Sequence, residues 1–124
     1  GGAINFLNKN DIGYEIVNVP GALEIPTVIN LIHNKINTNT FDIGFIAVGC
    51  VIRGETSHYD IVVNESASGI TQLSISNNII ITNSILTVEN NKQALDRSLN
   101  DTTNKGYHAA YACNLLIDIN NGKF

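Results

Sequence analysis

Residues 49–60, GCVIRGETSHYD, combine residue types that can bind an anion and move a proton. Gly54 allows a tight turn, and the amides of Glu55 and Thr56 come just before a helical pattern. Backbone amides at the start of a helix bind anions. His58 follows at the same point, and a histidine can carry protons near neutral pH. An ordinary helix cap by a hydroxyl side chain explains the same spacing without a ligand.

Two further segments carry candidate binding groups. In residues 19–26, VPGALEIP, the prolines and the glycine fix a turn and place Glu24 near a helix N-terminus. A carboxylate there also simply stabilises the helix dipole. The other segment comprises residues 85–87, Arg97 and residues 104–106. The planar guanidinium of Arg97 is suited to clamp a phosphate, although a solvated helix arginine is the more common case.

Short apolar runs alternate with helical patterns along the chain. The runs predict strands over residues 14–19, 41–52 and 79–82, and the second of these is apolar enough to be buried on both faces. Helical patterns cover residues 2–7, 24–35, 59–75 and 104–119, and another helix is expected to start at Asn90.

Strands separated by helices predict βαβ units and a parallel sheet. We therefore expect an α/β fold, a flavodoxin-like three-layer α/β/α sandwich that binds ligands beyond the carboxyl ends of its strands. A doubly wound domain normally opens with a strand, whereas this chain opens with a helical pattern. The first strand is accordingly expected to be missing from this chain.

The composition fits one domain over residues 1–124, because 44% of the residues are hydrophobic. The net charge of -4 and the lack of a basic run argue against nucleic acid, and no apolar run is long enough for a membrane span. Cys50 and Cys113 lack metal-ligand spacing and are expected to be buried thiols of a cytoplasmic protein. His33 and His108 are interpreted as structural.

Four motifs carry a resemblance to a known family: VPGALEIP, AVGCVIRGETSHYDIV, ILTVENNKQALDRS and NKGYHAA. They occur in the same order in lumazine synthases, and the resemblance extends from Gly2 to about Ile119. The resemblance implies a flavodoxin-like fold and an enzyme without cofactor or metal. It also implies the reaction: condensation of 5-amino-6-(D-ribitylamino)uracil with 3,4-dihydroxy-2-butanone 4-phosphate, with release of phosphate and water, as the penultimate step of riboflavin biosynthesis.

The resemblance also implies roles for individual residues. The residues expected to line the ribitylamino-uracil site are Ala22, Leu23 and Glu24, together with Cys50, Val51 and Ile52, the last three largely through backbone groups. The residues expected to hold the phosphate are Gly54, Glu55, Thr56 and Arg97, with Glu55 acting through its amide. His58 falls on the proton-transfer histidine of the family, and Arg97 falls on its phosphate-binding arginine.

Asn83 stands where many family members carry an aromatic side chain that reaches a neighbouring subunit's site, and Asp101 stands where many carry lysine. The resemblance implies sites shared around a five-fold ring. Residues 104–119 are apolar on more than one face, which independently predicts a partner subunit. We expect a homo-pentamer or a multiple of it. The alternative functions are a non-catalytic flavodoxin-like flavin or nucleotide binder and a shell-forming assembly protein.

Overall fold

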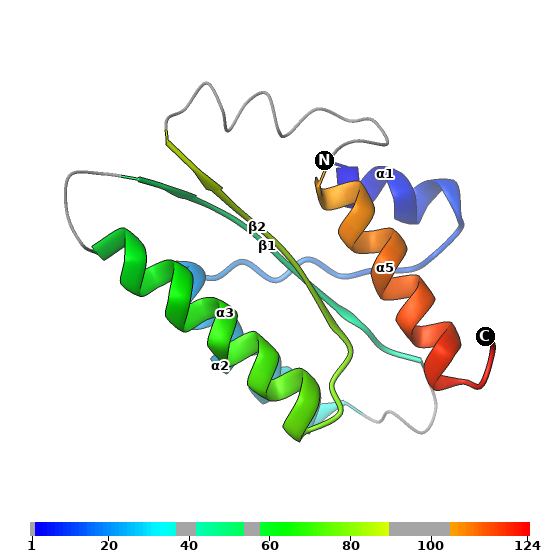
Figure 1. The fold of residues 1–124 in the computed structure, drawn as a ribbon. Coiled ribbons are helices and arrows are strands. Elements are labelled where there is room, and N and C mark those ends of the chain that lie inside the picture. Colours follow the sequence, from blue (N-terminus) through cyan, green and yellow to red (C-terminus); the bar gives the residue numbers. More distant parts are fainter. Residues whose placement is uncertain (1, 37–41, 54–57, 90–104) are drawn as a thin grey trace.

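The centre of the computed structural model, which describes residues 2–36, 42–53, 58–89 and 105–124, is a pair of parallel strands (Figure 1). Strand β1 (Phe45–Ile52) pairs with β2 (Ile81–Val88) over their whole length, from Phe45 opposite Ile81 to Ile52 opposite Val88. Both are rich in β-branched residues, which pack well on a pleated surface. The 19-residue helix α3 (His58–Ser76) connects them, so the predicted parallel βαβ unit is confirmed.

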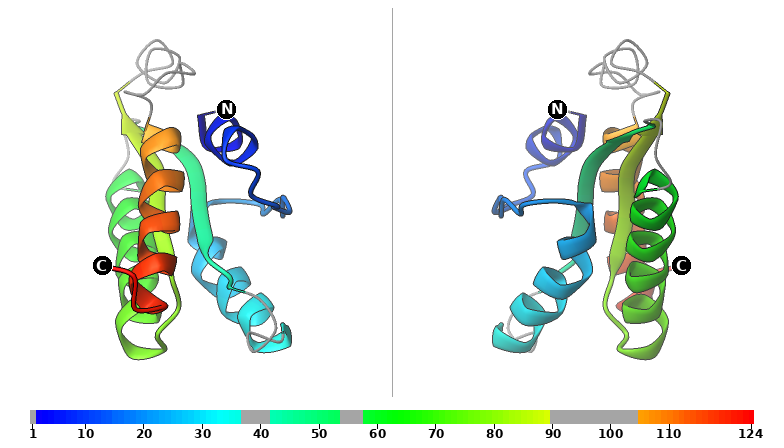
Figure 2. Two further views of the ribbon diagram at one scale, coloured as in Figure 1. Left: turned by 90° about the vertical axis from the view of Figure 1, so that its right-hand side faces the viewer. Right: turned by 90° about the vertical axis from the view of Figure 1, so that its left-hand side faces the viewer.

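Helices cover both faces of this strand pair. Helix α3 lies on one face together with α2 (Ile25–Lys35), which follows the short 3-10 helix η1 (Ala22–Glu24). Helices α1 (Gly2–Lys9) and α5 (Lys105–Asn120) lie on the other face, packed against each other (Figures 1 and 2). This layering confirms the expected α/β sandwich.

The apolar core lies between the strands and the α2–α3 layer. Its buried members are Ile25, Ile29, Ala47, Ile70, Ile79, Ile81 and Ile85. On the opposite face, α5 packs its small buried residues Ala109 and Ala110 against β2. Two hydroxyls of β2 are buried there, and Thr82 Oγ1 donates a 2.7 Å hydrogen bond to the carbonyl of Ala109. This bond satisfies a polar group that burial would otherwise penalise.

The predicted helices over residues 2–7, 24–35, 59–75 and 104–119 are confirmed as α1, α2, α3 and α5. The helix expected from Asn90 lies outside the described residues. None of the helices in the described part of the chain has the length and apolar character needed to cross a membrane.

Two strand predictions were wrong in detail. Residues 14–19 form no strand, because none of the strands described in the structure pairs with them, and their side chains are mostly exposed. A strand cannot satisfy its backbone groups without a neighbour. Residues 85–87, expected after a strand, belong to β2, because pairing with β1 extends that strand to Val88.

Strand β1 is buried on one face only, which corrects the expectation of burial on both. Ala47 is buried and Val51 packs against the core, whereas the alternating residues Val48, Cys50 and Ile52 are exposed. The reason is that α5 lies mainly over β2 and leaves the same face of β1 open. Cys50 is therefore an exposed free thiol and not a buried one, while Cys113 on α5 is buried as expected.

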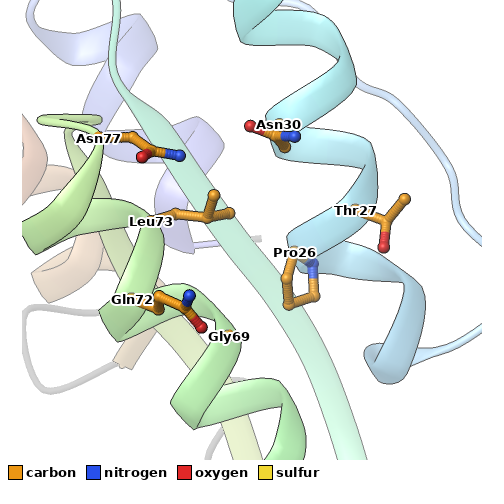
Figure 3. A pocket seen from close by; sticks show the side chains of 7 residues that line it. All are labelled: Pro26, Thr27, Asn30, Gly69, Gln72, Leu73 and Asn77. Atoms are coloured by element: carbon orange, nitrogen blue, oxygen red, sulfur yellow. The ribbon is translucent and has the colours of Figure 1, made fainter.

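The crossing of α2 and α3 depends on a glycine. A Cβ atom on Gly69 would lie 2.8 Å from Cγ of Pro26, whose ring cannot move aside (Figure 3). We predict that Gly69→Ala lowers the free energy of unfolding by about 1–2 kcal/mol, because overpacking outweighs the better helix propensity of alanine. Urea unfolding measures the change, and Ser68→Ala, at an exposed position of the same helix, is the control. A stabilised Gly69→Ala variant would contradict the close packing.

The two thiols should react at very different rates. Burial raises the pKa of the Cys113 thiol to about 11, while its hydrogen bond with Thr82 acts in the opposite direction. Because the thiolate is the nucleophile, Cys113 should be inert near about pH 8 until the protein unfolds, whereas exposed Cys50 should react rapidly. Stopped-flow titration with a chromogenic disulfide measures both phases. Cys50→Ser should remove the fast phase, and its persistence in that variant would contradict the assignment.

Candidate active site at the carboxyl edge of the sheet

The carboxyl end of β1 brings together one group of the predicted site residues. Cys50 and Ile52 are exposed on the open face of the strand, and Val51 between them turns its side chain to the core. At Val51, only the backbone is therefore available to a ligand on the open face. The main chain continues in register beyond the strand, because the amide of Arg53 donates a 2.8 Å hydrogen bond to the carbonyl of Val88.

The turn that carries Ala22, Leu23 and Glu24 is η1, and it contacts both β1 and α3. Ala22 packs against the core, whereas Leu23 and Glu24 are exposed. Pro26 lies in the first turn of α2, as the sequence predicted for this motif. Glu24 occupies the N-cap position of α2 but makes no capping hydrogen bond with its side chain. Its carboxylate therefore does not serve as a cap in this structure.

His58 is the first residue described after Arg53, and it begins α3. Its side chain is exposed. The N-terminus of a long helix carries partial positive charge from its unpaired amides, so an anion near His58 would be stabilised. Gly54, Glu55, Thr56 and Arg97, the predicted phosphate ligands, lie outside the described residues.

Among the predicted site residues that the structure describes, Asn83 does not lie at this edge. It pairs with Ala47 in the middle of the sheet. Its side chain is exposed, and its Oδ1 accepts a 2.8 Å hydrogen bond from the amide of Ile85. An aromatic side chain at this position would lack that acceptor.

The outer edge of β2 is capped at Ile85. Phe45 and Arg53 donate backbone hydrogen bonds to Ile80 and Val88, so the even-numbered residues of β2 bond to β1. Ile85 thus directs both of its backbone groups away from β1. Asn83 satisfies its amide, and Lys105 Nζ donates a 3.0 Å hydrogen bond to its carbonyl. An edge whose backbone groups are bonded in this way resists pairing with another strand. The hydrogen bond from Lys105 also holds the first residue of α5 against β2.

Arg53 links the ends of both strands to α3, a role that sequence reasoning missed. Its guanidinium carbon lies 5.7 Å from the centroid of the Tyr59 ring, and its Nη1 lies 3.7 Å from Oε1 of Glu89. The motif contained both Arg53 and Tyr59, but Glu89 follows β2 in a distant part of the sequence, so spacing along the chain did not reveal these contacts.

A groove between α2 and α3 lies away from this edge (Figure 3). Its lining residues are Pro26, Thr27, Asn30, Gly69, Gln72, Leu73 and Asn77. None of these side chains can act as an acid or a base, so the groove is not a candidate for proton-transfer chemistry. Within the described part of the chain, no three His, Cys, Asp or Glu side chains gather as a metal site.

Comparison with known proteins covers nearly the whole chain. The family model described as 6,7-dimethyl-8-ribityllumazine synthase matches residues 1–121. A protein of Bartonella henselae with that name is 47% identical over 116 residues, which are 94% of this chain and 74% of the relative. The Agrobacterium fabrum protein of the same name is 43% identical, covering 95% of this chain and 80% of the relative.

A further relative, 6,7-dimethyl-8-ribityllumazine synthase 1 of Rhizobium meliloti, is 43% identical over 95% of this chain and 78% of its own length. The match runs through the strand ends, η1 and the start of α3, where the exposed candidate groups gather. The chain belongs to the 6,7-dimethyl-8-ribityllumazine synthase family and is a transferase of riboflavin biosynthesis.

Proposed function

We propose that the carboxyl edge of the β1–β2 sheet is where this enzyme condenses 5-amino-6-(D-ribitylamino)uracil with 3,4-dihydroxy-2-butanone 4-phosphate. The observation that carries the proposal is the position of His58, which begins α3 directly beyond the end of β1. Parallel α/β sheets bind their ligands at this edge. The family match over residues 1–121 supports the reaction itself.

The reaction needs proton transfers more than a strong nucleophile from the protein. The amine of the uracil attacks the butanone carbonyl, and loss of water gives an imine. Phosphate then leaves by elimination, and ring closure with loss of a second water completes the lumazine. His58 moves protons between these intermediates, and holding two reactants in register provides much of the remaining acceleration.

The uracil substrate binds at the carboxyl edge, where η1 meets the end of β1. Contact between η1 and β1 supports this assignment, because it brings both groups of proposed contact residues to one place. Leu23 and Glu24 are exposed on η1, and Cys50 and Ile52 are exposed on β1. Val51 contributes its backbone, since its side chain belongs to the core. Ala22 does the same.

The phosphate of the butanone is assigned to Gly54, Glu55, Thr56 and Arg97. The sequence motif and the resemblance support this part of the proposal. The direction of α3 agrees with it, because the helix starts at His58 and its N-terminal amides favour an anion there. Arg97 stabilises the phosphate as it leaves.

The proposed assembly is a homo-pentamer or a multiple of it, in the cytoplasm. Helix α1 covers one side of α5, because Phe6 packs edge-on against Tyr107 at 5.2 Å and against Tyr111 at 6.0 Å. Part of the second apolar face of α5 is thus covered within the chain. Leu115, Leu116 and Ile119 nevertheless stay exposed on α5, as does Val48 on β1, and they are available to a neighbour. Both cysteines are unpaired, which fits a reducing compartment.

The proposed contact between neighbouring subunits also suggests a role for Asn83. Asn83 is exposed in mid-sheet and does not lie at the edge with His58 of its own chain. We therefore assign it to the site of an adjacent subunit, as the family resemblance implies. Its amide nitrogen can donate a hydrogen bond there, while its oxygen accepts the bond from Ile85.

Replacing His58 tests its role. We expect His58→Ala to lower kcat by about 10- to 100-fold, the lower end of the range for general acid–base catalysis. Lumazine fluorescence follows the reaction with both substrates. His33→Ala is the control, because His33 packs on Phe45 at the opposite end of β1. An unchanged rate in His58→Ala would remove this histidine from the mechanism.

Light scattering at micromolar concentration tests the assembly. We expect the mass of five chains or a multiple of it. Leu116→Glu should shift the protein to smaller species. Leu116 is 40% exposed in the single chain, and the substitution places a charge on the apolar surface proposed to meet a neighbouring subunit. Asn120→Glu adds the same charge to an exposed polar position of α5 and should leave the mass as it is. A stable, fully active monomer would refute the proposed shared site.

A further inference from the structure

We propose that Arg53 is a positioning residue, whose guanidinium fixes the first turn of α3, and with it His58, relative to the ends of β1 and β2. The inference rests on the proposed role of His58 as proton carrier. Arg53 itself is assigned no contact with the reacting atoms. It acts through Tyr59, the residue that follows His58 in the helix.

The backbone of Arg53 is held firmly. It follows β1 directly, and its amide donates to the carbonyl of Val88 at 2.8 Å. The side chain therefore starts from a fixed point at the carboxyl edge of the sheet. From there the guanidinium carbon reaches a position 5.7 Å from the centroid of the Tyr59 ring, within the range of a cation–π contact. The side chain of Arg53 thus connects the carboxyl end of β1 to the first turn of α3.

Glu89, which directly follows β2, restrains the guanidinium of Arg53. Its Oε1 lies 3.7 Å from Nη1 of Arg53, and the side chains are 57% and 60% exposed. An ion pair this exposed contributes little to folding stability. The ion pair instead restricts the orientation of the Arg53 guanidinium. Because Glu89 draws the guanidinium toward the end of β2, it can contact the Tyr59 ring in fewer orientations. Arg53 directly follows β1, Glu89 directly follows β2, and Tyr59 lies in α3, so the contacts join the three elements that define the candidate site.

The first turn of α3 depends on such a contact. His58, Asp60 and Ile61 are exposed, and the first buried residue of the helix is Val62. The core therefore anchors α3 from Val62 onward and leaves the turn that carries His58 without buried side chains. The amides of a first helical turn also lack partners within the helix. The half-buried ring of Tyr59 is the part of this turn that Arg53 holds.

The experiment uses the assembled enzyme and measures kcat and the KM of each substrate. Arg53→Met keeps the aliphatic stem and removes the charge, and Tyr59→Leu removes the ring. Each should lower kcat by about tenfold, part of the factor of 10²–10⁴ that a general acid–base residue provides. The KM of the phosphorylated butanone should not rise. Arg53→Lys and Tyr59→Phe, which preserve a cation and a ring, should recover most of the loss.

Two comparisons separate positioning from other effects. The double variant Arg53→Met/Tyr59→Leu should lose no more activity than either single variant, because both changes break one contact. Lys123→Met, which removes an exposed cation near the C-terminus, controls for net charge. Thermal unfolding of every variant checks that the fold persists. A rise in KM for the butanone phosphate with unchanged kcat would mean that Arg53 binds substrate directly, and would overturn the inference.

The same substitutions in the His58→Ala background distinguish this inference from the proposed function. With His58 absent, Arg53→Met should have no further effect on kcat, because there is no proton carrier left to position. If His58→Ala alone leaves the rate unchanged, the proposed role of His58 fails. If His58→Ala is slow but Arg53→Met reduces the rate by the same factor in both backgrounds, the positioning inference fails and the role of His58 stands.

Discussion

The parallel register between β1 and β2 is the constraint on which the rest of this structure depends. Eight consecutive residue pairs fix both strand ends at the same edge, so Arg53 and Glu89 leave the sheet side by side. A parallel pair also requires a crossover connection, and α3 provides it. The start of α3, and therefore His58, must then lie at the carboxyl edge. The parallel register and the crossover helix together determine where the candidate site lies.

The two faces of the sheet serve different purposes. The face toward α2 and α3 is closed by a continuous apolar core, in which isoleucines from both helices and from β2 pack around Ala47 of β1. The face toward α5 is closed over β2, where Thr82 bonds to the helix backbone, and open over β1. The exposed residues of β1 on that side include Cys50 and Ile52, which are the proposed substrate contacts. Incomplete cover within one chain is thus compatible with both a substrate and a neighbouring subunit.

Much of the fold could be predicted from the sequence, because helical periodicity and apolar runs report local burial. The helices over residues 24–35, 59–75 and 104–119 have this character. Strand formation over residues 14–19 and the burial of Cys50 were predicted wrongly, since both depend on whether another element covers or pairs with the segment.

For the site, the motifs and the resemblance selected residues by type and spacing. They did not reveal the contact of Arg53 with Tyr59 and Glu89, which exists only after three elements meet.

The candidate site combines a rigid support with a weakly held rim. Behind it, Gly69 lets α3 approach Pro26 closely, so the body of the helix cannot move toward α2 without overlap. At the rim, the first turn of the same helix has exposed side chains and is held by contacts that water screens. The core thus keeps the body of α3 aligned with the sheet, while the orientation of its exposed first turn depends on the contacts of Arg53 with Tyr59 and Glu89.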